Sequence, residues 1–571
     1  MAGWKGWFVM AALAAGVVAG ATLTGSASPA HSSSAVKRPN VVVLMTDDQT
    51  VESMRVMPNV KTLLADQGVT FTNNFVSYSL CCPSRSTFLT GQYAHNHGVW
   101  GNSPPNGGYY RLDSTNTLAV WLQRAGYQTI HLGKYLNGYG TRNPREIPPG
   151  WGDWHGSVDP TTYRYYNYTL NENGTLVAYG TGAANYQTDV YARKAVELIG
   201  REAADARPFF LWLAFLAPHA GAPRDPDDPA GMGTPSPAPR HRNAFATMPL
   251  PMPPSFNEAD VSDKPAGIRN RPLLTAAMIA KIRENYQQRL ESLLAVDEAV
   301  AQIVKELEVT GQLNNTYIVF TSDNGFFHGE HRVPTGKVLL YEPSIRVPLI
   351  VRGPGIPHGQ RRSQLVANID LAPTIVGISH AGPGRVMDGR SLLPFARDPR
   401  FISGRDILLE TPTYAAIRTP RWLYAEYTTG ERELYDLARD PDELVNHAGD
   451  FRYSRVKADL AMRLGRLRAC SGPVCRQGPE LRLLARARPA KSIRGCRRSR
   501  VLVVVSGPSA RRATQTSFYL DGRLLKRDTR APFTALVPRF LTRRGGSQLQ
   551  AIVTLSDSRR QTLSRRIAGC G

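Results

Sequence analysis

The feature that most constrains the fold is a set of three apolar runs, rich in β-branched and aromatic residues, that each stop at polar side chains. They are residues 40–45 (NVVVLM, then Thr-Asp-Asp), 209–217 (FFLWLAFLA, then Pro-His) and 317–321 (YIVFT, then Ser-Asp-Asn). A strand that is buried on both faces has this continuous apolar pattern. Helical periodicity lies between the runs, most clearly at 276–307. Strands that alternate with helices predict an α/β fold with a mostly parallel central sheet flanked by helices.

The polar residues that follow two of these runs are candidates for a metal site. Ligands of such sheets bind beyond the carboxyl ends of the strands, so we expect Asp47, Asp48, Asp323 and Asn324 to converge. Their carboxylate and amide oxygens are the ligands that Ca²⁺ or Mg²⁺ prefers. A helix cap and a turn are the structural alternatives, but the position at strand ends favours a metal site.

Length and patterning predict more than one domain, because 571 residues exceed the size at which one hydrophobic core stops growing. Short strand-like runs at 406–437 predict a smaller C-terminal antiparallel sheet. Runs from about 497 onward, with a hairpin turn at Asp521-Gly522, predict a separate all-β, sandwich-like (Ig-like) tail domain. The boundaries we expect are a signal peptide at 1–30, an α/β domain at 37–400, an antiparallel subdomain at 401–470 and a basic all-β module at 490–571.

Residues 222–264 interrupt the α/β pattern. They are rich in Pro, Asp and Ser and show little periodicity, so we expect a long surface loop. Loops of this kind often shape a substrate pocket.

The first 30 residues have the layout of a signal peptide. Lys5 supplies a short basic region, an apolar run extends from Trp7 to about Gly20, and small residues precede Ala30. An uncleaved anchor is the alternative, but the apolar run is shorter than the ~20 residues of a typical membrane span. We therefore expect the protein to be secreted, or to lie at the cell surface or in the periplasm.

The six cysteines fall into two groups. Four lie late in the chain, and they can form disulfides if the protein is exported. The most economical pairing is Cys470 to Cys475 and Cys496 to Cys570, and other pairings remain open. Cys81 and Cys82 are adjacent, and a disulfide between neighbours is strained, so at least one of them is expected to have another role.

Most of the net charge of +23 lies in the C-terminal module. Residues 476–571 hold 22 of the 69 lysines and arginines but 4 of the 46 aspartates and glutamates, which puts +18 there and +5 in the rest of the chain. Such a module attracts anionic glycans, cell walls, lipid head groups or nucleic acid alike. We expect the basic tail to bind an anionic surface, with no specific nucleic acid; a solvated basic face without a partner is the alternative.

The densest group of reactive side chains lies at 80–99 (LCCPSRSTFLTGQYAHNHGV). Cys81-Cys82-Pro83-Ser84-Arg85, followed by Leu-Thr-Gly at 89–91, resembles the sulfatase signature Cys-x-Pro-Ser-Arg with its downstream Leu-Thr-Gly. Other segments agree in order: TDD at 46–48, GYQTIHLGKYLN at 126–137, SDNG at 322–325, GK at 336–337, RVPLIVRGPG at 346–355 and LYDL at 434–437. The resemblance extends over about 39–446, and its Cys-Cys-Pro-Ser-Arg and Gly-Lys-Tyr-Leu-Asn forms are most similar to the N-acetylglucosamine-6-sulfatase branch.

The resemblance implies a sulfatase, alkaline-phosphatase-like fold and an exported enzyme that hydrolyses a sulfate ester of a sulfated sugar or an aryl sulfate. In this family the signature cysteine, here Cys81, is oxidised by a formylglycine-generating maturation enzyme. One hydroxyl of the formylglycine hydrate attacks sulfur, and deprotonation of the other expels sulfate, which a serine could not do. The resemblance also adds Cys81 to the ligands of the cation, expected to be Ca²⁺ with Mg²⁺ as the alternative.

The resemblance assigns further roles at the sulfate. It implies that Arg85 orients the formylglycine, that Lys134 and Lys337 contact sulfate oxygens, and that His219 contacts sulfate and protonates the leaving oxygen. The sequence departs from a common family pattern at Leu136, where many sulfatases have a histidine two residues after the lysine. Leucine cannot transfer a proton, so that role is absent here or is met by Asn137 or another group.

Two alternative functions remain open. One is a phosphonate monoester or phosphodiester hydrolase of the same superfamily, because formylglycine sites can also attack phosphorus. The other is a non-catalytic glycan-binding protein in which Cys81 is never matured.

Four histidines lie near the motifs: His95, His97, His328 and His331. For each of them a structural hydrogen-bonding role is at least as plausible as a catalytic one.

Overall fold

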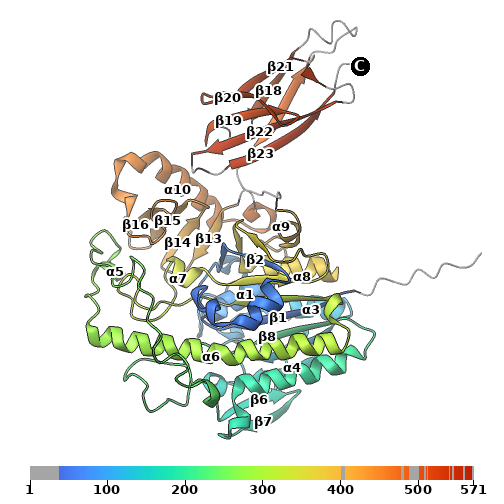
Figure 1. Ribbon diagram of the computed structural model, residues 1–571, viewed down its shortest axis with the longest axis vertical. Helices are drawn as coiled ribbons and strands as arrows, with labels where there is room; N and C mark the ends of the chain where they lie inside the picture. The colour runs from blue at the N-terminus through green and yellow to red at the C-terminus, as the bar shows by residue number, and fades with distance from the viewer. Residues whose placement is uncertain are drawn as a thin grey trace, which may run out of the picture. The chain divides into compact units, whose positions relative to one another are not determined.

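A ten-stranded mixed sheet forms the centre of the α/β part of the chain (Figure 1). The computed structural model describes residues 38–399, 405–476, 481–487, 500–506, 510, 512–538, 541–542, 546–556, 558 and 560–568. The strands follow one another in the order β11 (Gln360–Arg362), β2 (Val69–Phe71), β10 (Leu349–Arg352), β9 (Thr316–Ser322), β1 (Asn40–Thr46), β8 (Phe209–Ala214), β4 (Gln128–Gly133), β5 (Asp153–Ser157), β6 (Tyr168–Glu172) and β7 (Thr175–Tyr179). The central strands β9, β1, β8, β4 and β5 are parallel, whereas β10, β6 and β7 pair antiparallel with their neighbours.

The two faces of the sheet are covered by different helices. Alternate residues of a strand point to opposite faces, and in β1 Val42 and Leu44 pack into one core whereas Val41 and Val43 pack into the other. The first core includes α4 (Gln187–Ala203) and α6 (Ala276–Val309), which lie side by side in Figure 1. The second includes α1 (Cys81–Thr90), α3 (Leu118–Arg124) and α8 (Leu371–Ser379). The predicted α/β class, with helices on both sides of a mostly parallel sheet, is confirmed.

Two expectations about individual segments need correction. The apolar run at 209–217 ends as a strand at Ala214, three residues early. Residues 222–264 contain one short 3₁₀ turn, η6 (Pro239–His241), but they are not wholly a surface loop, since residues 234–238 are buried. Tyr186 donates a hydrogen bond to the carbonyl of Ser236 at 3.1 Å, which holds this part of the loop against α4.

Smaller sheets follow the α/β part. β3 (Asn74–Phe75) pairs with β12 (Val366–Ala367), and a four-stranded antiparallel sheet packs with α10 (Ser454–Arg468) around a third core. Its strands are β13 (Ile407–Glu410), β14 (Tyr414–Arg418), β15 (Trp422–Tyr427) and β16 (Arg432–Asp436). The remaining short helices are α2 (Ala94–His97), α5 (Ala266–Arg269), α7 (Glu342–Ile345) and α9 (Leu393–Arg397). The predicted antiparallel sheet is therefore present.

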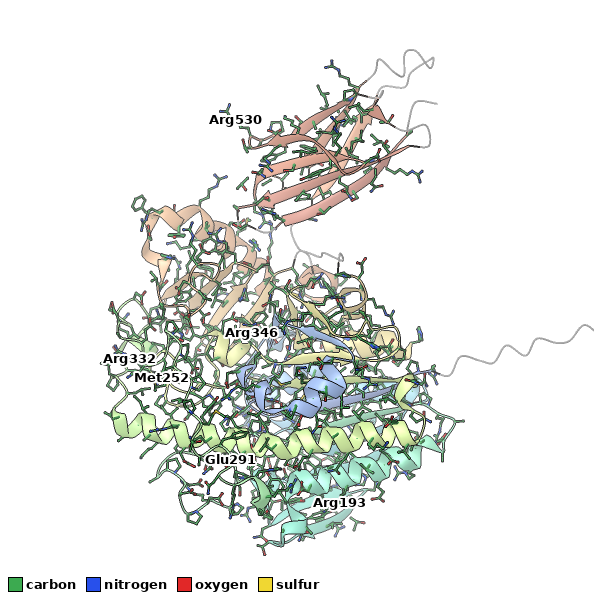
Figure 2. All side chains as sticks on the ribbon, in the orientation of Figure 1. Arg193, Met252, Glu291, Arg332, Arg346 and Arg530 are labelled. Carbon is green, nitrogen blue, oxygen red and sulfur yellow. A yellow bond between two sulfur atoms is a disulfide. The ribbon has the colours of Figure 1, made fainter. Side chains whose placement is uncertain are left out.

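The C-terminal residues form two antiparallel sheets around a core of their own, as expected for a sandwich. One sheet has the order β17 (Arg482–Ala487), β18 (Arg500–Ser506) and β21 (Thr534–Pro538); the other has the order β20 (Arg523–Asp528), β19 (Ala513–Leu520), β22 (Ser547–Leu555) and β23 (Arg560–Ile567). Asp521 and Gly522 have φ of 49° and 84°, the left-handed pair that a two-residue hairpin turn requires. Arg530, labelled in Figure 2, is exposed between β20 and β21. The exact domain boundaries stay a prediction.

The cysteines behave as expected where the structure describes them. Cys470 and Cys475 form a disulfide, whereas Cys81 and Cys82 are buried free thiols. Cys496 and Cys570, and the expected signal peptide at 1–30, lie outside the described residues. Within the described ranges, no helix is both long and apolar enough to cross a membrane.

Gly133 at the end of β4 provides a test of how closely the central strands must approach. It has φ of +104°, and a Cβ there would lie 2.2 Å from the carbonyl oxygen of Ala214 in β8. Gly138 has φ of +85° with open space around it. We expect Gly133→Ala to lower the free energy of unfolding by about 1–3 kcal/mol more than Gly138→Ala, because the first adds a steric clash to the same left-handed strain. Urea denaturation of both variants measures this; equal losses would contradict it.

Candidate active site

The polar residues after β1 and β9 meet at the carboxyl edge of the sheet. These strands are paired neighbours, with Thr46 opposite Ser322, so the residues that follow them are brought together. Asp48 adopts a left-handed conformation (φ 68°), and its main-chain N–H donates to Asp323 Oδ1 at 3.2 Å. Asn324 Nδ2 donates to Asp48 Oδ1 at 2.5 Å. The convergence expected from the strand ends is therefore present.

Cys81 lies against this cluster at the first residue of α1. Lys337 Nζ is 3.1 Å from its Sγ and Lys134 Nζ is 3.5 Å from it, while the thiol donates to Asp47 Oδ1 at 3.7 Å. The ligand atoms of Asp47, Asp48, Cys81 and His219 all lie within 4.8 Å of one another. The residue expected to be the nucleophile is thus surrounded by both cations and carboxylates.

Arg85, one turn further along α1, fixes this helix to three strand ends. Its side chain is fully buried; Nε donates to Asp323 Oδ2 at 2.8 Å and a terminal nitrogen donates to Asp47 Oδ2 at 3.4 Å. The other terminal nitrogen donates to the carbonyl of Lys134 at 2.6 Å, just after β4. The guanidinium therefore contacts carboxylates of the cluster, and through them positions the start of α1.

Two lysines complete the compensation of charge. Lys134 forms an ion pair with Asp47, and Lys337 forms one with Asp48 and lies 3.4 Å from Asn324 Oδ1. Burial by itself raises the pKa of Asp47, but Lys134, His219, Arg85 and Lys337 together lower it below its ordinary value. Burial likewise raises the pKa of Asp48, and its cationic neighbours reverse the effect, so both carboxylates remain ionised.

The donor set fits a hard divalent cation. Asp47, Asp48, Asp323 and Asn324 supply three carboxylates and one amide oxygen, and all four are at most 2% exposed. Several oxygen donors held together in this way are what Ca²⁺ or Mg²⁺ requires. These residues, with Cys81 beside them, are the ones that would hold the ion.

His219 lies after β8 at the same edge. Its Nδ1 donates to the carbonyl of Ala220 at 2.7 Å, which leaves Nε2 facing Asp48 Oδ2 at 3.7 Å. Burial lowers its pKa to about 4, although Asp48 and Asp47 act in the opposite direction. All five residues expected at the sulfate, namely Cys81, Arg85, Lys134, His219 and Lys337, are therefore brought to one place.

The neighbourhood of Leu136 contains a residue that the sequence did not single out. Leu136 itself is buried in the second core. Asn137 Nδ2 donates to the hydroxyl of Tyr163 at 2.6 Å, and the ring of Tyr163 lies under Lys134 Nζ (4.5 Å to the centroid) and beside the ring of His219 (4.8 Å). Tyr163 lies in a tyrosine-rich segment without periodicity, so the sequence around it carries no signal for a site residue. The one related signal is its partner Asn137, which belongs to the Gly-Lys-Tyr-Leu-Asn form.

The four histidines near the motifs make structural contacts. His95 donates to Glu410 through Nδ1 and to the carbonyl of Cys470 through Nε2, at 2.9 Å and 2.8 Å. His97 Nε2 lies 3.1 Å from the hydroxyl of Thr87, and His331 Nδ1 donates to Glu258 at 2.7 Å. His328 packs against the rings of Tyr286 and Phe326. Within the part of the chain that the structure describes, none of the four forms a hydrogen bond or an ion pair with Cys81.

Comparison with known proteins identifies the family. A family model described as Sulfatase matches residues 39–381, and one described as N-sulphoglucosamine sulphohydrolase, C-terminal matches residues 329–470. The chain is 34% identical over 492 residues to the N-acetylglucosamine-6-sulfatase of Homo sapiens, covering 77% of this chain and 86% of that protein. It is 35% identical over 499 residues to an arylsulfatase of Volvox carteri, covering 77% and 76%.

Solved structures show the same fold. One, a protein in complex with its substrate D-glucosamine-2-N,6-O-disulfate, has a TM-score of 0.62 and 26% identity and covers 75% of this chain and 97% of that chain. The phosphonate monoester hydrolase of Agrobacterium radiobacter has a TM-score of 0.55 and 24% identity, covering 76% and 96%. The second likeness is one of fold alone.

The contacts of His95 predict a dependence of stability on pH. Burial alone would lower the pKa of His95, but its hydrogen bond to Glu410, the charge of Glu410 and the Cys470 carbonyl raise it above the ordinary value. A histidine whose pKa is higher in the folded than in the unfolded protein stabilises the fold fully at pH values below its pKa in the unfolded protein. This contribution is lost as the pH rises through its pKa in the folded protein. We expect His95→Gln to cost about 1 kcal/mol or less at about pH 6 and less still at about pH 9. Denaturation midpoints measure it, with exposed His358→Gln as control; a cost that grows with pH would contradict it.

Proposed function

This chain belongs to the sulfatase family and is a sulfuric ester hydrolase, and on that premise we propose that it removes sulfate from a sulfated sugar with a formylglycine made from Cys81 and a bound divalent cation. The observation that supports this most is the set of groups around Cys81 Sγ, with Lys337, Lys134 and Asp47 at 3.1, 3.5 and 3.7 Å. The relatives named for sugar sulfates support the choice of a sugar over a simple aryl sulfate.

Each part of the site has a separate task in this proposal. Formylglycine, once formed by a maturation enzyme, supplies a hydrated aldehyde with one hydroxyl for attack on sulfur and a second for release of sulfate. Lys134 and Lys337 bind sulfate oxygens and offset the charge that develops as the ester bond breaks. Arg85 keeps the start of α1 at the edge of the sheet through Asp323.

The cation site is proposed for Ca²⁺, with Mg²⁺ as the alternative. Asp47, Asp48, Asp323 and Asn324 would hold the ion next to Cys81, where it would neutralise negative charge on the substrate. Ion pairs to Lys134 and Lys337 keep Asp47 and Asp48 ionised, which an oxygen-ligated cation requires.

Export is also proposed. The layout of residues 1–30 supports a signal peptide, and the Cys470–Cys475 disulfide supports an oxidising compartment, where such bonds persist. Secretion, the cell surface and the periplasm all satisfy these two observations.

Replacement of the nucleophile is the direct test. We expect Cys81→Ala to lower kcat/KM for 4-nitrophenyl sulfate and for N-acetylglucosamine 6-sulfate by at least about a thousandfold, with an unchanged unfolding midpoint. Ser86→Ala is the matched control on α1, because no hydrogen bond of the Ser86 hydroxyl occurs within the described part of the chain. Mass spectrometry of the peptide that contains Cys81 should find formylglycine.

Three results would contradict the proposal. Activity that survives Cys81→Ala would refute the nucleophile. A large preference for phenyl phosphonate over 4-nitrophenyl sulfate would favour a phosphonate hydrolase. An unmodified thiol in protein from the native host, together with glycan binding but no turnover, would favour a binding protein.

The basic C-terminal module is proposed to hold the enzyme on an anionic surface, with a sulfated polysaccharide as the partner that suits the proposed substrate. Its charge of +18 over residues 476–571 supports this. Arginines on the two edge strands of the larger sheet, β20 and β23, are exposed: Arg523, Arg527, Arg560 and Arg566.

Removal of that charge should weaken attachment without slowing turnover. We expect a triple variant with Gln in place of Arg523, Arg527 and Arg560 to bind heparin resin at least about tenfold more weakly than the wild-type protein. The affinity of the wild-type protein for the resin should fall steeply as the salt concentration rises. The kcat for a small sulfate ester should not change. Arg→Gln at exposed Arg207, Arg439 and Arg452 is the charge-matched control; an equal loss in the control would mean that net charge alone is responsible.

A further inference from the structure

We propose that Tyr163 donates the proton to the leaving oxygen of the sulfate ester, and that Asn137 and Cys82 position its hydroxyl for this step. The inference rests on the proposed function, which it deepens. It gives Tyr163, whose partner Asn137 directly follows Leu136, the protonation of the leaving oxygen that the resemblance implies for His219.

The position of Tyr163 comes from the main chain around it. Tyr163 ends a short 3₁₀ turn, η4 (Thr161–Tyr163), and its carbonyl accepts a hydrogen bond from the N–H of Ala222 at 2.9 Å. Two residues later, Tyr165 donates through its hydroxyl to the carbonyl of His219 at 2.8 Å. The segment that carries Tyr163 is therefore fixed to the loop that carries His219.

The ring of Tyr163 faces the sulfate-binding groups. Lys134 Nζ lies 4.5 Å from the ring centroid and 3.5 Å from Cys81 Sγ, so one ammonium group bridges the tyrosine and the nucleophile position. The centroid of the His219 ring is 4.8 Å from that of the Tyr163 ring. A sulfate bound between Lys134 and Cys81 would thus lie next to Tyr163.

The orientation of the Asn137 amide is determined by Cys82. The Cys82 thiol donates to Asn137 Oδ1 at 3.3 Å, and its sulfur accepts the main-chain N–H of Asn137 at 3.1 Å. Because the amide oxygen is occupied by the thiol, the amide nitrogen must point to Tyr163, where Nδ2 donates to the hydroxyl oxygen at 2.6 Å. Cys82 therefore acts on Tyr163 through Asn137.

This arrangement leaves the tyrosine proton available. The hydroxyl oxygen already accepts from Asn137, and no acceptor for the hydroxyl hydrogen occurs within the residues that the structure describes. A phenol whose oxygen is held by a donor directs its own hydrogen away from that donor. The Lys134 ammonium lies over the face of the same ring, 4.5 Å from its centroid.

As an oxygen of the formylglycine hydrate bonds to sulfur and the bond between sulfur and the leaving oxygen breaks, the Tyr163 hydroxyl hydrogen passes to the leaving oxygen, which departs as the sugar alcohol. The proton of the attacking hydroxyl passes to water. The Lys134 ammonium and the Asn137 N–H stabilise the phenolate that remains against the effect of burial, which raises the pKa of Tyr163, and the phenolate then takes a proton from water. General acid catalysis of this kind typically contributes about 10²–10⁴-fold.

The test compares leaving groups that do and do not need a proton. Nitrophenolate leaves without protonation, whereas a sugar alkoxide does not. We expect Tyr163→Phe to lower kcat for N-acetylglucosamine 6-sulfate by about 10²–10⁴-fold and to change kcat for 4-nitrophenyl sulfate less than about tenfold. Across a series of substituted phenyl sulfates, log kcat of the variant should depend more steeply on the leaving-group pKa. Tyr166→Phe is the control, since its buried hydroxyl has no partner within the described ranges.

The positioning residues are tested by rescue. Asn137→Ala should reproduce the leaving-group dependence of Tyr163→Phe, and the double variant should be no worse than either single variant. Cys82→Ser, which keeps a donor for Asn137 Oδ1, should retain more sugar sulfatase activity than Cys82→Ala.

The inference is overturned by any of three outcomes. Equal loss on both substrates in Tyr163→Phe would indicate a structural role. If Tyr163→Phe hydrolyses the sugar sulfate as fast as the wild-type protein, another group is the acid. If only His219→Gln makes kcat depend more steeply on the leaving-group pKa, that group is His219. A wild-type protein that hydrolyses 4-nitrophenyl sulfate separates these outcomes from failure of the proposed function, in which no sulfate ester is turned over.

Discussion

The compensation of buried charge at the edge of the sheet is the constraint on which the rest of the structure depends. Asp47, Asp48 and Asp323 are almost fully buried, and so are the cations Arg85 and Lys134 that face them. Removal of one partner from a buried ion pair costs about 3–5 kcal/mol, whereas a whole protein is stable by about 5–15 kcal/mol. Each charged residue must therefore be held in place by an element that cannot move independently.

The parallel strands meet that requirement. The neighbouring strands of the sheet are β9, β1, β8 and β4, although Thr316 of β9 follows its partner Asn40 of β1 by 276 residues. The loops that follow their carboxyl ends lie at one edge of the sheet. Apolar side chains on both faces, against α6 on one side and α1 and α8 on the other, fix the strands laterally. Arg85 then joins α1 to the ends of β1, β9 and β4. The sheet is thus the scaffold and the charges determine which loops can occupy its edge.

The parts of this arrangement that the sequence predicted are those with a local physical signal. Continuous apolar runs ending in Asp47-Asp48 and Asp323-Asn324 predicted both the strands and the convergence of the carboxylates, because burial on two faces leaves a distinct pattern. The role of Tyr163 had no such signal, since it depends on an amide orientation determined by Cys82, 81 residues away. The burial of residues 234–238 was missed for the same reason: composition indicated a loop, but a tertiary hydrogen bond from Tyr186 holds it inward.

The distribution of charge separates attraction to a polymer from recognition at the nucleophile. Around Cys81 three carboxylates face three cations, so the site has little excess charge before a cation and substrate enter. The excess of +18 lies instead in residues 476–571. A second attachment point raises the effective concentration of a polymeric substrate without any new contact at the reacting bond. The specificity for a given sulfate ester can therefore depend on the loops around Tyr163 and His219. The affinity of the C-terminal module for an anionic surface can change without altering that specificity.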